Sequence, residues 1–172
     1  MSAHLHVSWS DYHDAIELLA LAVHDSGWPF NQIVCIARGG LRVGDTLSRL
    51  FKLPLAIIST QSYMGEAGNV RGELRIAKHM TMTSASLGDR ILLVDDLVDS
   101  GHTLEVMKEH LLTRCTGIQD LRTAVLYYKA CSKCVPDYYV EHLPDSPWIH
   151  QPFEPYEQIQ VSDLRERIRR LH

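Results

Sequence analysis

The stretch ILLVDDLVDSGHTL, residues 91–104, decides the fold class of this chain. Its first four residues, Ile91–Val94, form an apolar and partly β-branched run, which is typical of a parallel strand buried on both faces. Asp95 and Asp96 follow at the carboxyl end of this strand, where ligands sit in open α/β sheets. The pattern therefore predicts an α/β fold with a carboxylate pair at the edge of a parallel sheet.

A short polar loop after the acid pair leads into a predicted helix. The loop runs from Asp99 to Thr103 around Gly101, and apolar residues then recur at helical spacing at Leu104, Met107 and Leu111. The first turn of a helix presents unpaired N–H groups and the positive end of the helix dipole, so a phosphate can bind there. Taken alone, the loop could instead be an ordinary turn in which the acids are solvated and Ser100 or Thr103 caps the helix.

The whole string resembles the phosphoribosyl pyrophosphate signature of the type I phosphoribosyltransferases. The resemblance implies that Asp95 and Asp96 hold the ribose hydroxyls, directly or through Mg²⁺, and that the loop holds the 5′-phosphate. It also implies that Asp99 is a catalytic residue, as general base or electrostatic partner near N7 of a purine. The donor-binding residues that it implies here are Asp95, Asp96, Leu97, Val98, Asp99, Ser100, Gly101, His102 and Thr103.

A second loop with an anion-binding composition, ARGGL at residues 37–41, follows another predicted strand. Gly39 and Gly40 let the backbone approach an anion, and Arg38 adds a permanent positive charge. An isolated match could be a tight turn with a surface arginine. The segment resembles the pyrophosphate loop of the 6-oxopurine phosphoribosyltransferases, which often carries a cis non-proline peptide bond. The resemblance implies that Arg38, Gly39 and Gly40 bind the donor and that Arg38 is catalytic; Ala37 stands where the bacterial xanthine-guanine branch has serine.

Three further segments extend the resemblance. Ser62 and Tyr63 match a pair on a mobile loop that closes over the reaction in the purine enzymes, although they could be ordinary loop residues. Lys129 follows a predicted strand, and the corresponding lysine of the family reaches the exocyclic oxygen of a 6-oxopurine; a lone lysine there would otherwise be solvated.

The third segment, DSPWIHQPFE at residues 145–154, resembles the base-binding hood of xanthine-guanine phosphoribosyltransferases with one proline inserted. The resemblance implies a hood over residues 142–157 in which Trp148 stacks on the base and Ile149 contributes to the base site. Trp148 could otherwise be a core or interface residue. His102, Pro147 and His150 depart from the family pattern, and they leave the choice among guanine, xanthine and hypoxanthine open.

Helix and strand patterns alternate along the chain, which indicates an α/β rhythm. Ser8 and Asp11 suggest a capped helix with apolar positions at Ile16, Leu19, Ala20 and Val23. The pattern predicts strands at 33–37, 55–59, 91–94, 121–128 and 137–141, and helices at 41–51 and 161–171, the first with Leu47, Leu50 and Phe51 inward. Residues 60–84 read as a flexible loop or hairpin. We expect a single type I phosphoribosyltransferase domain over 1–172: a central, mostly parallel sheet flanked by helices, with a small hood.

The amino-acid composition limits the class of protein to which the chain can belong. The chain has 172 residues, 45% hydrophobic and 22% charged, which are ordinary globular values. A net charge of −4 argues against broad nucleic-acid binding, and no apolar run is long enough for a membrane span. Without a recognisable signal sequence, the expected location is cytoplasmic. Cys131 and Cys134 have metal-like spacing with His142 and His150 nearby, but a zinc site needs two more ligands, so reduced thiols are the favoured interpretation.

The expected function is Mg²⁺-dependent transfer of phosphoribosyl from phosphoribosyl pyrophosphate to N9 of a 6-oxopurine, with release of pyrophosphate, in purine salvage. The expected partners are that donor and the base, with no nucleic acid and no membrane, and the chain is expected to be a homo-oligomer. Two alternatives stay open: a regulatory protein that binds a nucleotide or nucleic acid on the same fold, and a pyrimidine or orotate phosphoribosyltransferase.

Overall fold

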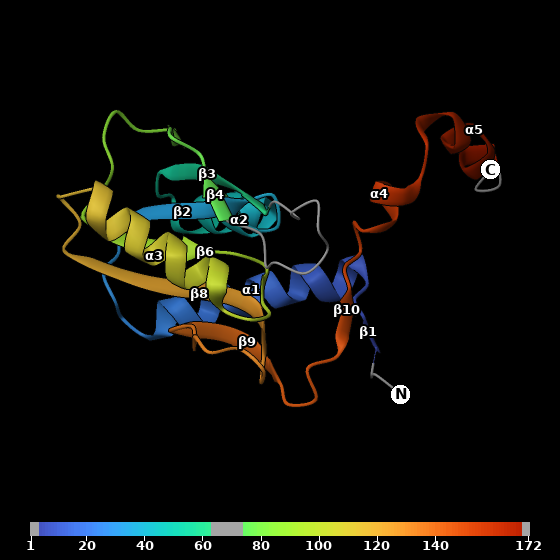
Figure 1. Ribbon diagram of the computed structural model, residues 1–172, viewed down its shortest axis with the longest axis horizontal. Helices are drawn as coiled ribbons and strands as arrows, with labels where there is room; N and C mark the ends of the chain where they lie inside the picture. Colours follow the sequence, from blue (N-terminus) through green and yellow to red (C-terminus); the bar gives the residue numbers. More distant parts are fainter. Residues whose placement is uncertain (1–3, 63–73, 170–172) are drawn as a thin grey trace.

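Four parallel strands form the centre of the main sheet (Figure 1). They are β2 (Gln32–Ala37), β3 (Leu55–Ser62), β6 (Arg90–Val94) and β8 (Asp120–Lys129). β2 and β6 are buried over nearly their whole length, which explains their continuous apolar sequences. The computed structural model describes residues 4–62 and 74–169. The strands predicted at 33–37, 91–94 and 121–128 are thus confirmed, with ends that shift by one residue.

The strand order is β4-β3-β2-β6-β8-β7. β4 (Leu74–Ile76) and β5 (Thr81–Met82) both run antiparallel to β3, so the predicted hairpin is present between Thr60 and Ile76. β7 (Leu97–Val98) and β9 (Tyr138–Leu143) both pair with β8, in parallel. The predicted strand 137–141 therefore begins one residue later and ends two residues later. β3 continues to Ser62, three residues beyond the strand predicted at 55–59.

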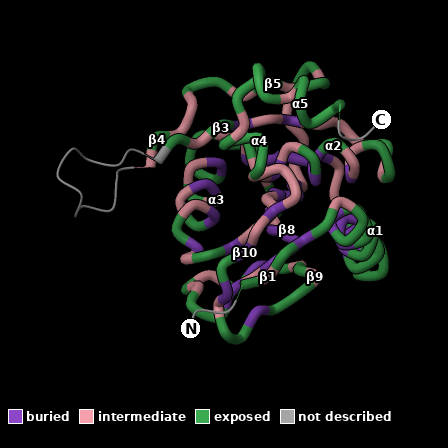
Figure 2. Tube along the Cα trace, turned by 90° about the vertical axis from the view of Figure 1, so that its right-hand side faces the viewer, coloured by how far each residue is buried: buried purple, intermediate pink, exposed green. Residues whose placement is uncertain are grey.

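Helices cover both faces of the sheet. α1 (Trp9–Asp25) and α2 (Gly40–Phe51) pack with one apolar cluster, and α3 (His102–Arg114) packs with the other. The predicted capping box of α1 is present, because Ser8 and Asp11 each accept a backbone hydrogen bond from the other. Figure 2 shows the buried positions gathered along the inner sides of these helices and strands. Within the described ranges, no helix combines the length and apolarity that a membrane span requires.

A second, two-stranded sheet joins the N-terminal segment to the segment that follows β9. β1 (His4–His6) runs parallel to β10 (Trp148–His150), and Leu5 pairs with Ile149. The sequence patterns predict no strand in either segment. β10 continues into α4 (Pro155–Gln158), a 3-10 turn η1 (Val161–Asp163) and α5 (Leu164–Arg169), which extend away from the main sheet (Figure 1).

Two predictions at the helices were wrong. Leu50 is 53% exposed, because the α2 face that meets the sheet is centred on Val43 and Leu47. The helix predicted at 161–171 is instead a 3-10 turn followed by the six-residue α5. Neither η1 nor α5 buries a side chain, so no packing supports a longer helix in this basic segment.

Candidate active site

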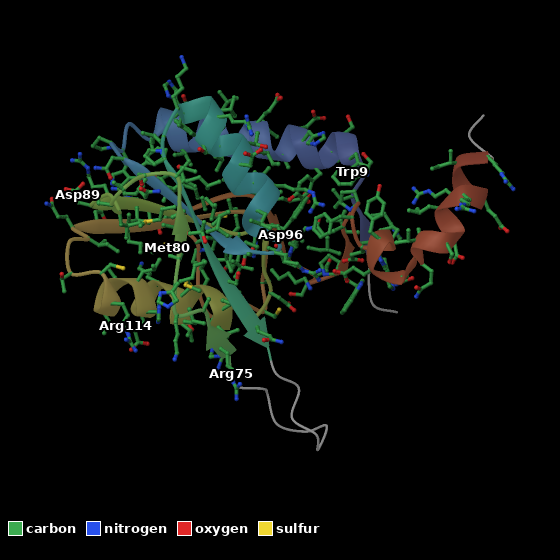
Figure 3. All side chains as sticks on the ribbon, turned by 90° about the horizontal axis from the view of Figure 1, so that it is seen from above. Trp9, Arg75, Met80, Asp89, Asp96 and Arg114 are labelled. Atoms are coloured by element: carbon green, nitrogen blue, oxygen red, sulfur yellow. The ribbon has the colours of Figure 1, made fainter. Side chains whose placement is uncertain are left out.

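The acid pair lies directly after β6 and is held by the neighbouring strand β8. The Asp95 amide donates to the carbonyl of Ala124 at 3.2 Å, and the Asp96 carbonyl accepts from Leu126 at 3.1 Å. The Asp96 amide also donates to Oδ1 of Asp95 at 2.9 Å, which fixes the orientation of the Asp95 side chain relative to the Asp96 backbone. Asp96 is labelled in Figure 3 beside the start of α2. The pair is therefore a rigid feature of the sheet edge.

The glycines of the second loop pack against this acid pair. A Cβ atom at Gly40 would lie 2.6 Å from the carbonyl oxygen of Val94 and 3.0 Å from Cα of Asp95. A Cβ atom at Gly39 would overlap the Asp96 carboxylate. The sequence needs glycine at both positions because any side chain would separate the two loops. Segments that are far apart in the sequence thus pack against each other at this edge of the sheet.

Arg38 lies on this loop but points outward. Its guanidinium is 85% exposed and pairs with Oε1 of Glu157 in α4 at 3.1 Å. The Ala37–Arg38 peptide bond is cis, as the family resemblance implied. Arg38, Gly39 and Glu157 line one cavity together.

Burial dominates the electrostatics of the acid pair. Burial raises the pKa of the Asp95 carboxyl well above its ordinary value, and the neighbouring Asp96 carboxylate adds to the rise. Burial likewise raises the pKa of Asp96. A cation between these carboxylates and an anionic ligand would remove the penalty. Their oxygen ligands fit Mg²⁺, which binds through one or two carboxylates together with substrate phosphates. Among the described residues, no three His, Cys, Asp or Glu side chains form a metal site by themselves.

The predicted phosphate loop forms a cavity of about 160 Å³ at the start of α3. It is lined by Asp95, Asp96, Leu97, Val98, Asp99, Ser100, Gly101, Thr103 and Leu104. Gly101 has φ +84°, a conformation that favours glycine, and its carbonyl accepts the helical hydrogen bond of Glu105 at 3.0 Å. The amides at the beginning of α3 thus border the cavity. His102 is exposed and is not among the lining residues; the other residues of the predicted stretch 95–103 all line this cavity.

Lys129 and Asp99 meet at the end of β8. The Lys129 ammonium lies 3.2 Å from Oδ1 of Asp99, and the two side chains are 8% and 64% exposed. The Trp148 ring centroid lies 6.0 Å from the same ammonium, and this ring is 60% exposed. Sγ of Cys131 lies 3.6 Å from Oδ1 of Asp99. A buried cation, an exposed carboxylate and an exposed aromatic ring therefore lie together, and a flat ligand with a carbonyl edge could contact all three.

Successive side chains of β10, the strand of the predicted hood, point to opposite sides of the strand. Ile149 is buried in the core cluster, so its side chain points away from the Trp148 face and only its backbone borders that face. His150 lies between the two histidines of β1: Nε2 is 2.9 Å from Nδ1 of His4, and its ring stacks on His6 at 4.3 Å. The N-terminal strand therefore fixes the hood beside the tryptophan.

Gln151 is a site residue that sequence reasoning did not assign. Its buried amide nitrogen lies 3.4 Å from Oδ2 of Asp96, and its side-chain oxygen has no partner within the described part of the chain. Tyr12, from α1, also buries a hydroxyl without a partner there, and burial and the nearby Asp96 carboxylate raise its pKa above the ordinary range. Gln151 lies within the quoted hood motif, but nothing in the motif indicated that it reaches the acid pair.

The loop-closure pair is only partly described. Ser62 is the last residue of β3 and its backbone pairs with Leu74. Tyr63 lies outside the described residues, together with part of the predicted flexible segment. Cys131 and Cys134 are free thiols in a turn that contacts the phosphate loop, where the amide of Lys133 donates to the Ser100 carbonyl at 3.2 Å.

Comparison with known proteins agrees with this geometry. Residues 8–158 match the phosphoribosyl transferase domain family. Xanthine-guanine phosphoribosyltransferase of Gluconobacter oxydans is 34% identical over 149 residues, 86% of this chain and 83% of that protein. The enzyme of that name from Idiomarina loihiensis is 28% identical, covering 86% and 85%. The crystal structure of purine phosphoribosyltransferase from Pyrococcus horikoshii has a TM-score of 0.70 and 28% identity, covering 87% of this chain and 93% of that one. This chain belongs to the phosphoribosyl transferase family, in the purine branch of its type I members.

Proposed function

We propose that the protein transfers a phosphoribosyl group from phosphoribosyl pyrophosphate to N9 of a 6-oxopurine in purine salvage. The observation that carries the proposal is that three features lie next to one another: the Gly39–Gly40 loop, the acid pair with its phosphate loop, and the pair of Lys129 and Trp148. These features offer, in turn, an anion cradle, oxygen ligands for a ribose, and a platform for a base. The family and its purine relatives support the same assignment.

The donor binds across the first two features in this proposal. The amides at the start of α3 and the side chains of Ser100 and Thr103 hold the 5′-phosphate. Asp95 and Asp96 accept hydrogen bonds from the ribose hydroxyls, and Gly39 and Gly40 allow the diphosphate to approach the backbone. Arg38 leaves Glu157 and pairs with the diphosphate, since a guanidinium can donate two parallel hydrogen bonds to phosphate oxygens.

Mg²⁺ is the proposed metal. The acid pair would hold it together with donor oxygens, and it would neutralise negative charge on the diphosphate. The protein's own contribution is to keep both carboxylates close to Gly39 and Gly40. Half-buried carboxylates with raised pKa values are costly to ionise without a nearby cation, which supports a site that is completed by a metal and substrate.

The base end follows from the Lys129–Asp99 ion pair. When a 6-oxopurine stacks on Trp148, its O6 replaces Asp99 as the acceptor for the lysine ammonium. Asp99 is then released toward N7, where it accepts a proton or stabilises positive charge on the ring. The N9–C1′ bond forms, the bond from C1′ to the diphosphate oxygen breaks, and pyrophosphate leaves with the electron pair. Positioning and charge stabilisation supply most of the rate in such a transfer.

We also propose that the chain forms homo-oligomers. Leu18 and Leu21 are 54% and 57% exposed on one side of α1, which gives a copy of the chain an apolar surface to contact. Light scattering coupled to gel filtration measures the mass directly. A monomeric mass at assay concentration would reject this part of the proposal.

The function is tested by incubating the purified protein with phosphoribosyl pyrophosphate, Mg²⁺ and one base at a time, and measuring pyrophosphate release. Guanine, xanthine or hypoxanthine should be turned over, and adenine and orotate should be poor substrates. The Asp95→Asn/Asp96→Asn double variant should lose activity and donor affinity by calorimetry, while the exposed control Asp14→Asn should retain both. Preference for orotate, or unchanged donor affinity in the double variant, would overturn the assignment.

A further inference from the structure

A second cavity, of about 520 Å³, lies away from the site described above, between α3 and the segment that follows β4. Its apolar floor consists of Ile58, Ile76, Met80 and Leu111. Arg114, at the end of α3, and Met80 are both labelled in Figure 3. The volume lies in the range of small-molecule sites. The phosphate loop lies at the opposite end of α3, about 12 to 18 Å along the helix from the cavity residues His110 to Arg114.

Three basic side chains border this cavity. Lys78 comes from the segment after β4, and His110 and Arg114 come from α3. None of the residues that line the cavity is acidic, and no ion pair of the described structure includes Lys78 or Arg114. This concentration of positive charge occurs in a chain whose net charge is −4. Like charges on two facing elements repel each other, and a bound anion would turn that repulsion into attraction to both.

The floor and the basic groups together restrict the chemistry of the ligand. A small inorganic anion would pair with the cations but leave the apolar floor in contact with water. A neutral aromatic molecule would cover the floor but leave the cations without partners. We propose that this cavity binds a nucleoside monophosphate, with its ring on Met80 and Leu111 and its phosphate between Lys78 and Arg114. No residue that lines the cavity distinguishes a 6-oxo from a 6-amino purine in the way that Lys129 does.

The position of the cavity connects it physically to the phosphate loop. Leu111 lines the cavity, and Leu104 lines the phosphate-loop cavity; both belong to the same buried face of α3. A nucleotide that draws Lys78 and Arg114 together therefore acts on the helix whose other end holds the phosphate loop.

AMP is the probe that separates this cavity from the active site, because the proposed base site discriminates against a 6-amino group. Calorimetry should show AMP binding to the wild type and equally to the Asp95→Asn/Asp96→Asn variant. The Lys78→Glu/Arg114→Glu variant should bind AMP at least about tenfold more weakly, since charge-assisted contacts to phosphate are lost. The control Arg165→Glu, an exposed charge reversal on α5, should leave AMP binding unchanged.

Two further ligands and one further variant complete the test. Inorganic phosphate and adenosine should each bind more weakly than AMP, because each uses only half of the cavity. Lys78→Ala/Arg114→Ala should reproduce the loss with a smaller change of charge, and all these variants of Lys78 and Arg114 should keep the basal kcat. The proposal is overturned by absence of AMP binding to the wild type, by loss of AMP binding in the acid-pair variant, by retention in both Lys78/Arg114 variants, or by equal affinity for phosphate and AMP. The choice of AMP rests on the proposed preference for 6-oxopurines; if AMP bound at the active site instead, both Lys78/Arg114 variants would retain AMP binding.

Discussion

Lys129 and Asp99 satisfy each other in the structure, at 3.2 Å, but their environments differ. The ammonium is nearly buried, while the carboxylate is 64% exposed. The exposed partner can leave at small cost, because water replaces the lost contact, whereas the buried cation needs a new acceptor. In the proposed function, a ligand that enters this corner is therefore selected by whether it offers an acceptor to Lys129.

The first prediction concerns base selection. Adenine presents an amino group to Lys129, donor to donor, so the wild type should prefer hypoxanthine over adenine by about 1–3 kcal/mol, or about fivefold to 150-fold. Lys129→Met should lower turnover of hypoxanthine and narrow this preference. Trp148→Ala should instead lower kcat/KM for both bases by a similar factor, since stacking does not depend on the edge of the ring. The measurement is kcat/KM for both bases in all three proteins; an unchanged ratio in Lys129→Met would contradict the role of the lysine.

The second prediction concerns the stability cost of Asp95. Its folded pKa lies well above the ordinary 3.8, so the folded state binds the proton more tightly than the unfolded state. As pH rises from about 3.8 through the folded pKa, the stability of the wild type should fall relative to Asp95→Asn. The variant should thus have the higher Tm at neutral pH without Mg²⁺ or donor, by about 2–4 °C for each kcal/mol relieved.

Thermal unfolding across pH measures this difference. The amide side chain of the Asp95→Asn variant keeps an oxygen that can accept the Asp96 N–H, so the variant tests charge rather than a lost hydrogen bond. The two Tm values should converge near pH 3.8. A variant that is less stable than the wild type at neutral pH would show that the carboxylate is stabilising, against the sign derived above. Loss of activity in the more stable protein is the expected companion result.

At the scale of elements, the junction between β2 and α2 depends on contact with the end of β6. The third prediction is that Gly40→Ala destabilises the fold by about 1–3 kcal/mol, because its Cβ would meet the backbone of Val94 and Asp95 and no flexible side chain can move aside. The control is Gly117→Ala, where a Cβ meets nothing within 4 Å. Denaturant unfolding should separate the two variants. Equal stabilities would mean that the two loops can move apart freely.

The elements that sequence predicted well are those whose signal is local. The apolar run at Ile91–Val94 and the capping box of Ser8 and Asp11 each span only a few neighbouring residues. The interactions that form them are therefore visible in the local sequence. β1 and β10 were missed because each is three residues long and forms only through the other, across the whole chain. Gln151 was missed for the same reason: its contact with Asp96 is tertiary, and no spacing in the sequence reveals it.

At the scale of the whole molecule, the segment after α4 contributes little to the core. The fourth prediction is that removal of residues 160–172 changes Tm by less than about 3 °C, since η1 and α5 bury no side chain and Val161 is 81% exposed. Glu157 and its ion pair with Arg38 are retained in this truncation. Differential scanning calorimetry at matched concentrations is the measurement. A larger fall in Tm would show that the segment packs on something in solution, and the mass of the truncated protein would then show whether that partner is a second copy.

The pairing of β1 with β10 has a consequence for how the protein is made. His4 and His150 are 146 residues apart, so at translation rates of about 5–20 residues per second the first strand waits on the order of ten seconds for its partner to leave the ribosome. The Gly39–Gly40 loop, the acid pair and β8 have all been synthesised before then. A nascent chain should therefore acquire its donor half well before its tryptophan platform. Premature termination after β8 would yield a fragment that lacks both the tryptophan and the 131–134 turn that packs against the phosphate loop.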